Sequence, residues 1–146
     1  MSAKELARIL EAEEGRVPYV YLDHLGFQTI GVGRLVDSKK GGRLRDSEIN
    51  FMLSNDIFEL KVELLRVYPW MVSLSPVRLD TMILMRFQLG LVGMAKFVRT
   101  LSAVKQGNWE IAAQGLRNSL WAKQTPERVE RLAKQLETDT YQYKDG

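Results

Sequence analysis

The sequence predicts an α+β protein with one N-terminal helix, a small antiparallel β lobe and a larger helical lobe. Strand-forming residues gather in residues 17–36, where residues 23–26, Gly31 and Gly33 divide them into short runs. In most of the remaining chain the apolar residues recur at helical intervals. We therefore expect one helix, then a hairpin or meander, then a set of amphipathic helices.

The first helix is predicted from its cap and from its end. Ser2 and Glu5 have the spacing of a capping box, and apolar residues follow at helical intervals at Leu6, Ile9 and Leu10. Gly15 is a natural stop for a helix. Glu14 is therefore expected at or beside the C-terminal end of this helix.

A long helix is predicted over residues 46–67, after a loop over residues 39–42. Its apolar stripe consists of Ile49, Met52, Leu53, Ile57, Leu60 and Leu64, and Pro69 lies just past its end. A helix of this length could bridge a small β lobe and a larger helical lobe.

The helical lobe is predicted from its caps and breakers. Ser75 and Pro76 start an almost wholly apolar helix, which Gly90 ends. Short helices follow over residues 97–106 and 109–118, the second capped by Asn108, and a last helix runs from Thr125 and Pro126 to about residue 136.

Composition limits the classes of function. The chain has 146 residues, with 21 basic and 18 acidic residues and a formal charge of +3, which favours anionic partners such as nucleic acid, anionic lipid or cell-wall polymer without choosing among them. Cysteine is absent and His24 is the one histidine, so thiolate and histidine-rich metal sites are excluded, although a carboxylate-bound cation stays open. We expect no cofactor.

Two carboxylates and a hydroxyl in residues 14–35 could perform acid–base chemistry. Glu14, at a helix C-terminus, faces the negative end of the helix dipole, which favours the protonated form that a general acid needs. Asp23, in a polar turn, could more easily stay ionised, and cleavage of a glycosidic bond uses such a pair. Glutamate at a helix end and aspartate in a turn are also common surface residues. Glu13 is an alternative candidate for the general acid. His24 is expected to be an exposed turn residue rather than a second base.

Several motifs, in the same order along nearly the whole chain, resemble the phage lysozymes of glycoside hydrolase family 24, in particular the T-even phage type. The N-terminal motifs are Glu14-Gly15-Arg16, Tyr21-Leu22-Asp23 and Thr29-Ile30-Gly31-Val32-Gly33. The downstream motifs are Phe87-Gln88-Leu89-Gly90, Trp109-Glu110-Ile111-Ala112-Ala113, Trp121, and Gln124-Thr125-Pro126-Glu127-Arg128.

The resemblance implies a lysozyme-like fold in a single domain over residues 1–146, with the β lobe over about residues 14–50 and a helical lobe over about residues 51–146 that also takes in the first helix. It implies that Glu14, Asp23 and Thr29 form a catalytic triad that hydrolyses the β-1,4 bond between N-acetylmuramic acid and N-acetylglucosamine in peptidoglycan, with inversion. Arg128 would be the partner of Glu14.

The same resemblance places four residues where the family lines its cleft: Leu35, Phe87, Gln88 and Thr100. For each of them, a role in packing or on the surface fits the sequence equally well. Trp109 and Trp121 are expected to anchor the core of the helical lobe rather than to bind sugars.

Four residues depart from the family pattern. Arg34 replaces a common histidine, so any ion pair at that position must differ, and Leu84 replaces a common asparagine. Leu120 replaces an arginine, and Gly115 stands where a polar side chain that contacts substrate is usual. These departures bear on the polar network of the cleft.

The expected partner is the glycan strand of bacterial peptidoglycan. We expect the protein to be a monomer that neither binds nucleic acid nor inserts stably into a membrane. The N-terminus lacks a signal peptide and no apolar run approaches the roughly 20 residues of a membrane span, so we expect synthesis in the host cytoplasm and release that depends on a holin. A particle-associated lytic domain is equally compatible. The alternatives are an inactive wall-binding module, a lytic transglycosylase and a basic nucleic-acid-binding domain, the last resting on charge alone.

Overall fold

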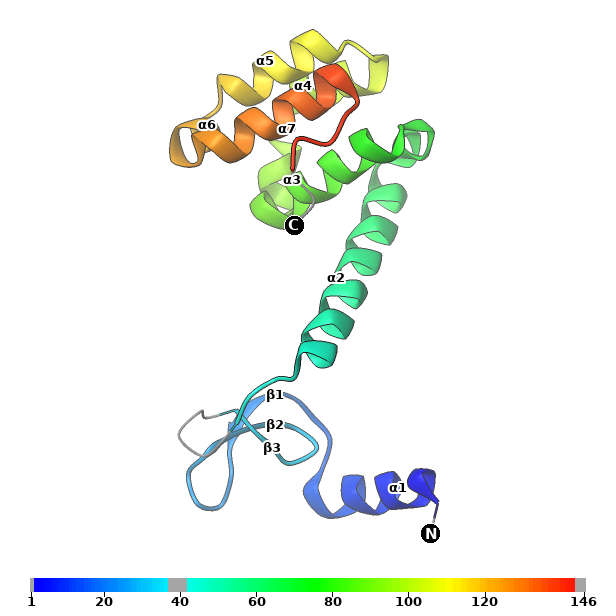
Figure 1. The fold of residues 1–146 in the computed structure, drawn as a ribbon, viewed down its shortest axis with the longest axis vertical. Coiled ribbons are helices and arrows are strands. Elements are labelled where there is room, and N and C mark those ends of the chain that lie inside the picture. Colours follow the sequence, from blue (N-terminus) through cyan, green and yellow to red (C-terminus); the bar gives the residue numbers. More distant parts are fainter. Residues whose placement is uncertain (1, 37–41, 144–146) are drawn as a thin grey trace. The chain divides into compact units, whose positions relative to one another are not determined.

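The computed structural model describes residues 2–36 and 42–143, and its contacts divide the chain into two units, Met1–Met52 and Leu53–Gly146 (Figure 1). The predicted extents of the two lobes, and the assignment of the first helix to the helical lobe, stay predictions. A small sheet near the N-terminus and a set of helices after it confirm the predicted α+β class.

Helix α1 (Ala3–Glu14) begins and ends where its sequence signals predict. The Ser2 hydroxyl accepts the N–H of Glu5 at 3.2 Å, and Glu5 Oε2 accepts the N–H of Ser2 at 3.0 Å, which completes the capping box. Gly15 follows at a φ of 79°, a conformation that glycine adopts without strain. Glu14 is thus the last residue of the helix.

Three short strands form an antiparallel sheet in the order β1 (Val17–Leu22), β2 (Gln28–Gly31) and β3 (Arg34–Leu35). Thr29, on the central strand, pairs with Tyr21 on one side and with Leu35 on the other. This position leaves Thr29 only 2% exposed. Of the predicted loop over residues 39–42, residues 39–41 lie outside the described part of the chain.

Helix α2 (Asp46–Val67) has the predicted bounds, and the boundary between the units falls within it. Pro69 does follow its end, but it also opens the 3-10 helix η2 (Pro69–Ser73), which the sequence analysis missed. Five residues are too few to display a helical period, so the pattern of apolar residues could not predict this element.

Between residues 74 and 143, the structure describes five further helices: α3 (Pro76–Ala95), α4 (Val98–Gln106), α5 (Trp109–Arg117), α6 (Leu120–Gln124) and α7 (Pro126–Thr138). The Ser75 hydroxyl caps α3, as predicted. Gly90, at a φ of 74°, kinks α3, and helical structure resumes after it up to Ala95. Asn108 occupies the cap position of α5, but its side chain makes no capping bond, contrary to prediction. The short helix α6 was not predicted.

The apolar core belongs to unit 2. Its largest fully buried members come from α2, η2, α3, α4, α5 and α7: Leu64, Met71, Met82, Met85, Met94, Val104, Leu116, Val129, Leu132 and Leu136. Helices α5 and α7 lie side by side over much of their length (Figure 1). Trp121 is buried and Trp109 packs against the same cluster, so both are core residues, as predicted.

Among the described residues, no single helix has the length and apolar character needed to cross a membrane. Helices α3 and α4 reach that length and composition only as a pair bent by 114° at the break between them.

Candidate active site

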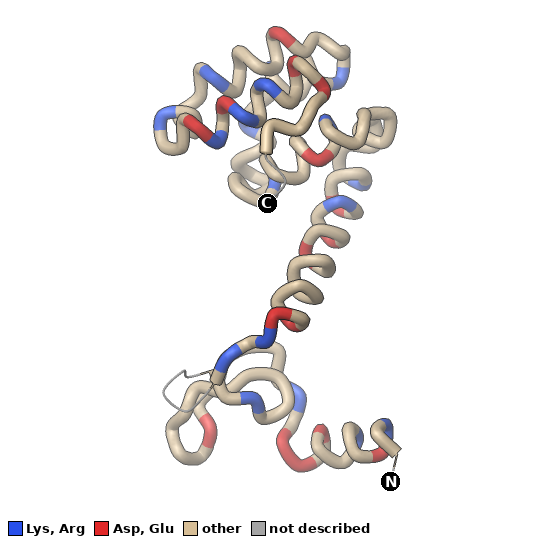
Figure 2. The backbone as a smooth tube through the Cα atoms, in the orientation of Figure 1, with Lys and Arg blue, Asp and Glu red and all other residues tan. Residues whose placement is uncertain are grey.

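Glu14 lies directly against the turn that joins β2 and β3. A Cβ atom built on Gly33 would be 2.8 Å from Glu14 Oε2 and 3.0 Å from its Cδ, so a side chain at position 33 would displace the carboxyl group of Glu14. Gly33 also has a φ of +66°, which favours glycine. Figure 2 shows that acidic residues gather at the C-terminal end of α1. The glycine after the strand motif therefore has a steric role beside the candidate acid.

Asp23 and Thr29 are joined through the backbone of one residue, Phe27. Asp23 Oδ1 accepts the N–H of Leu25 at 2.9 Å and that of Phe27 at 2.8 Å. The Phe27 carbonyl accepts the N–H of Asp23 at 2.9 Å and the hydroxyl of Thr29 at 3.0 Å. These bonds fix the aspartate and the threonine at one end of the β1–β2 hairpin. The sequence analysis missed Phe27 because its backbone, and not its side chain, makes the connection.

The ion pair at Arg34 does differ from one that a histidine could make, as the sequence analysis predicted. Arg34 donates through Nη1 to Glu48 Oε2 and through Nη2 to the Arg43 carbonyl. Glu48 Oε1 accepts the N–H of Arg45 at 2.8 Å. The pKa of Glu48 is held below its usual value, mainly by the hydrogen bond from Arg34 and to a smaller extent by that from the Arg45 N–H.

Three predicted residues of unit 2 meet around one hollow of about 280 Å³. Phe87, Gln88 and Arg128 line it, and Arg128 Nη1 donates to Gln88 Oε1. Leu84, which departs from the family pattern, lines the same hollow and is 41% exposed. Phe87 is 61% exposed and so does not pack in the interior.

The rest of this hollow is formed by Arg131, Leu132 and Tyr143. The Arg131 guanidinium lies over the Tyr143 ring, 4.8 Å from its centroid, in a cation–π contact. Its Nε atom is buried and has no hydrogen-bond partner among the described residues. Arg131 and Tyr143 were not among the predicted site residues, although Arg131 follows Arg128 at one helical turn.

Two predicted substrate contacts occupy packed positions. Thr100 is 4% exposed, and a Cβ atom built on Gly115 would be 2.1 Å from its Oγ1, so the hydroxyl fills the space that a side chain at position 115 would need. Leu35 is half-buried in β3, and a Cβ atom built on Gly42 would be 2.4 Å from its carbonyl oxygen. Both residues touch glycines whose missing side chains allow the close contact.

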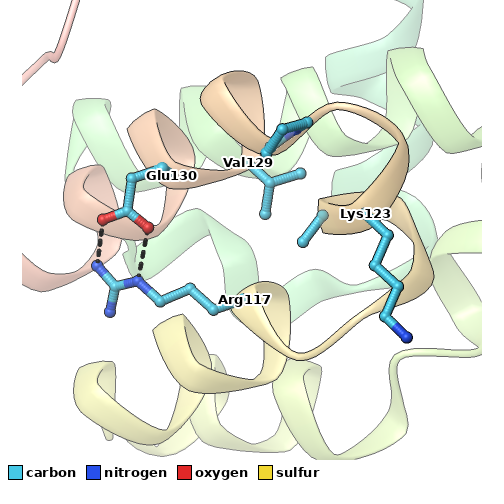
Figure 3. Close-up of a pocket in the computed structure, with 6 residues that line it drawn as sticks. Arg117, Lys123, Val129 and Glu130 are labelled. Carbon is cyan, nitrogen blue, oxygen red and sulfur yellow. Dashed lines mark hydrogen bonds and ion pairs between the residues drawn. The ribbon is translucent and has the colours of Figure 1, made fainter.

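Two other hollows of about 290 Å³ lie in unit 2. One is lined by Asp56, Glu59, Leu60, Glu63, Arg86 and Phe87. The other lies between α5, α6 and α7, where Arg117 and Glu130 form a bidentate pair and Lys123 extends away from it (Figure 3). In residues 2–36 and 42–143, no three metal-ligating side chains are close enough together to hold an ion.

Comparison with known proteins identifies the family. Residues 11–138 match the phage lysozyme family. The chain is 27% and 28% identical to probable T4-type lysozymes 1 and 2 of Dictyostelium discoideum, over 90% and 92% of this chain and 93% and 95% of theirs. It is 29% identical to the pre-baseplate central spike protein of Enterobacteria phage T4 over 87% of this chain, and the match covers 26% of the spike protein.

The matched residues include all the motifs from which the resemblance was drawn, from residues 14–16 to residues 124–128. They also include both structural units. The chain belongs to the phage lysozyme family and is a glycoside hydrolase of the lysozyme type, which hydrolyses peptidoglycan.

Proposed function

We propose that this lysozyme cleaves the β-1,4 bond between N-acetylmuramic acid and N-acetylglucosamine, with Glu14 as general acid and with Asp23 and Thr29 activating water. The main support is the backbone of Phe27: its carbonyl accepts from the Asp23 N–H and from the Thr29 hydroxyl, and its N–H donates to the Asp23 carboxylate. A water molecule activated by two groups needs them at a fixed separation, and bonds to one shared residue favour that.

In the proposed reaction Glu14 transfers its proton to the glycosidic oxygen as the bond to the anomeric carbon breaks. Its carboxyl group lies beside the backbone of Gly33, where a Cβ atom would displace it. A general acid already placed close to its reacting geometry loses less entropy on reaching the transition state.

The attacking water would be held between Asp23 and Thr29. Asp23 Oδ1 accepts two backbone N–H groups, whereas no described residue donates to Oδ2, which can therefore accept a water proton. The Thr29 hydroxyl proton is directed at the Phe27 carbonyl, so the lone pairs of Oγ1 can accept the other water proton. The water oxygen would then attack the anomeric carbon, and Asp23 would take up the proton.

Attack from the side opposite to the leaving group inverts the anomeric carbon. The mechanism requires room for a water molecule between the carboxyl groups, roughly 6.5–9.5 Å. A lytic transglycosylase would instead use a hydroxyl group of the sugar and would need no water held by Asp23.

We infer that Phe87 and Gln88 contact the glycan, because they are exposed and line one hollow with Arg128. Arg128 is proposed as the partner of Glu14, and Gln88 would orient its guanidinium. Leu35 is proposed as a further contact. For Thr100 we propose an indirect role, because its hydroxyl is directed at Gly115 and is buried.

We further propose that the protein acts as a monomer, needs no cofactor, is made in the host cytoplasm and reaches the wall with the help of a holin. The likeness to a phage spike protein supports a second possibility, a lytic domain carried on the phage particle.

The test compares the wild type with Glu14→Gln and with Glu13→Gln, a matched control that removes a carboxylate one residue earlier. Reducing-end release from purified peptidoglycan is measured and the products are identified by mass. We expect muramic-acid reducing ends from the wild type and from Glu13→Gln, and none from Glu14→Gln.

Full activity in Glu14→Gln would contradict the assignment, and loss in Glu13→Gln alone would transfer the acid role to Glu13. Anhydro-sugar products would establish a transglycosylase. Binding to the wall without any product would establish an inactive wall-binding module.

A further inference from the structure

We propose that Arg34 and Glu48 form a positioning pair that fixes the β2–β3 turn against which Glu14 rests. The inference depends on the proposed role of Glu14 and assigns neither residue a contact with substrate. It concerns an ion pair within unit 1 that joins the sheet to the start of α2.

The Glu48 carboxylate connects three segments of the chain. Its Oε1 accepts the N–H of Arg45, the residue before α2, at 2.8 Å, and its Oε2 accepts from Arg34 on β3. The other terminal nitrogen of Arg34 donates to the carbonyl of Arg43. One glutamate and one arginine thus join the last strand, the segment before the helix, and the first turn of the helix.

The path from this pair to Glu14 is short. Arg34 pairs with Ile30 across the turn, and Gly33 immediately precedes Arg34 in the chain. Gly33 is the residue on which a Cβ atom would come within 2.8 Å of Glu14 Oε2. A shift of the Arg34 backbone would therefore move the surface on which the Glu14 carboxylate lies.

The pair is partly shielded from water and remains charged in mild acid. The Arg34 side chain is 32% exposed and that of Glu48 is 30% exposed, whereas the Arg45 side chain, 3.6 Å from the same carboxylate, is 76% exposed. The lowered pKa of Glu48 keeps its carboxylate ionised below its usual range. Arg34 can therefore hold the turn in mild acid as well as at neutral pH.

A role limited to stability can be separated from a positioning role by the choice of variants. Glu48→Gln keeps an amide oxygen that can still accept the Arg45 N–H, but it removes the charge that Arg34 binds. Arg34→Ala removes the pair altogether, and Arg34→Lys keeps the charge without the planar fork. Arg45→Ala is the matched control, because it removes a neighbouring positive charge and leaves the backbone bond to Glu48 in place.

The experiment measures kcat and KM on soluble peptidoglycan fragments, well below the melting temperature of each variant. In Arg34→Ala and Glu48→Gln we expect kcat to fall about 10-fold while KM stays within about twofold, because displacing a catalytic group costs rate more than binding. Arg34→Lys should recover part of the loss, and Arg45→Ala should keep wild-type kcat.

The proposal would be overturned if Glu48→Gln and Arg34→Lys both kept wild-type kcat, even with lowered melting temperatures. It would also be overturned if kcat fell in Arg45→Ala as much as in Glu48→Gln. If Arg34→Ala does not fold, these two variants still decide the question. If Glu14→Gln retains activity, the proposed function itself is wrong; if Glu14→Gln is inactive and the other variants are unaffected, only the positioning role is wrong.

Discussion

Gly33 and Glu14 are in such close contact that one additional carbon atom on the glycine would lie 2.8 Å from Oε2 of the glutamate. A larger residue at position 33 is disfavoured for two separate reasons, its contact with the Glu14 carboxyl group and its backbone φ of +66°. Gly31, two residues earlier, has a φ of +68° but no atom within 4 Å of the place where its Cβ would be. This pair of glycines allows the two reasons to be measured separately.

We predict that Gly33→Ala and Gly31→Ala lose similar stability, about 1 kcal/mol each, because both force alanine into a left-handed conformation. Only Gly33→Ala should also lose activity, by about 10-fold or more, because it displaces the Glu14 carboxylate. Thermal unfolding and reducing-end release measure the two effects. An equal loss of activity in both variants would mean that backbone strain, and not the contact with Glu14, is responsible.

Thr29 should be needed for its hydroxyl group and not for its shape. Thr29→Val keeps the branched shape that suits the central strand, but it cannot accept a hydrogen bond from water. We predict a fall in kcat of about 100-fold for Thr29→Val and a much smaller fall for Thr29→Ser, which keeps the hydroxyl. Losing the bond to the Phe27 carbonyl should also lower the stability of Thr29→Val by about 1 kcal/mol. Equal activity of the two variants would remove Thr29 from the mechanism.

The contact between Thr100 and Gly115 predicts that the effect of Gly115→Ala on stability depends on which residue occupies position 100. In the wild type, Gly115→Ala should destabilise by about 1–3 kcal/mol, because the new Cβ atom meets the Thr100 hydroxyl. In Thr100→Ala the hydroxyl is absent and only the Cβ atom of residue 100, 3.3 Å away, is in tight contact. Gly115→Ala should then no longer destabilise, because the higher helix propensity of alanine offsets that contact. Chemical denaturation of the four proteins of this cycle checks the result. Additive effects would show that the two positions do not interact.

The acid stability of unit 2 should depend on Arg117. This residue binds Glu130 at 2.9 and 3.0 Å and Glu137 at 2.6 Å, and hydrogen bonds from it are the largest cause of the lowered pKa values of both glutamates. Since their pKa values are lower in the folded state, the stabilisation is complete above the unfolded value of about 4.3 and is lost as the pH falls below it.

We therefore predict that Arg117→Met lowers stability at pH 7 by about 1 kcal/mol or less per pair, given the exposure of the glutamates, and that its stability falls less steeply below about pH 4. Urea denaturation between pH 3 and pH 7 measures this. Lys123→Met, which removes a charge from the same hollow, serves as the control and should follow the wild-type slope (Figure 3). An unchanged slope in Arg117→Met would assign the acid sensitivity to other groups.

Local signals in the sequence were sufficient for the main elements of the fold. The capping box at Ser2 and Glu5, the proline after α2 and the Ser75 cap act within a few residues of the chain, so the sequence displays them directly. Elements of five residues, η2 and α6, were missed because they are too short for apolar residues to repeat at a helical period.

The candidate site was predictable only as residue types at given spacings. The family motifs pointed to Glu14, Asp23 and Thr29, and their mechanistic roles remain proposals. Nothing in the sequence indicated that the Phe27 backbone joins two of them, because every residue except proline carries the same backbone groups and only folding decides which ones meet.

The sequence by itself determined the class of fold, the order of its long elements and the position of Glu14 at a helix end, since periodicity and capping are local properties of the chain. The tertiary structure decided that Gly33 lies against Glu14, that the Thr100 hydroxyl occupies the space beside Gly115 and that Arg34 binds Glu48. Each of these contacts joins segments that the folded chain brings together, and which atoms come within bonding distance depends on how those segments pack.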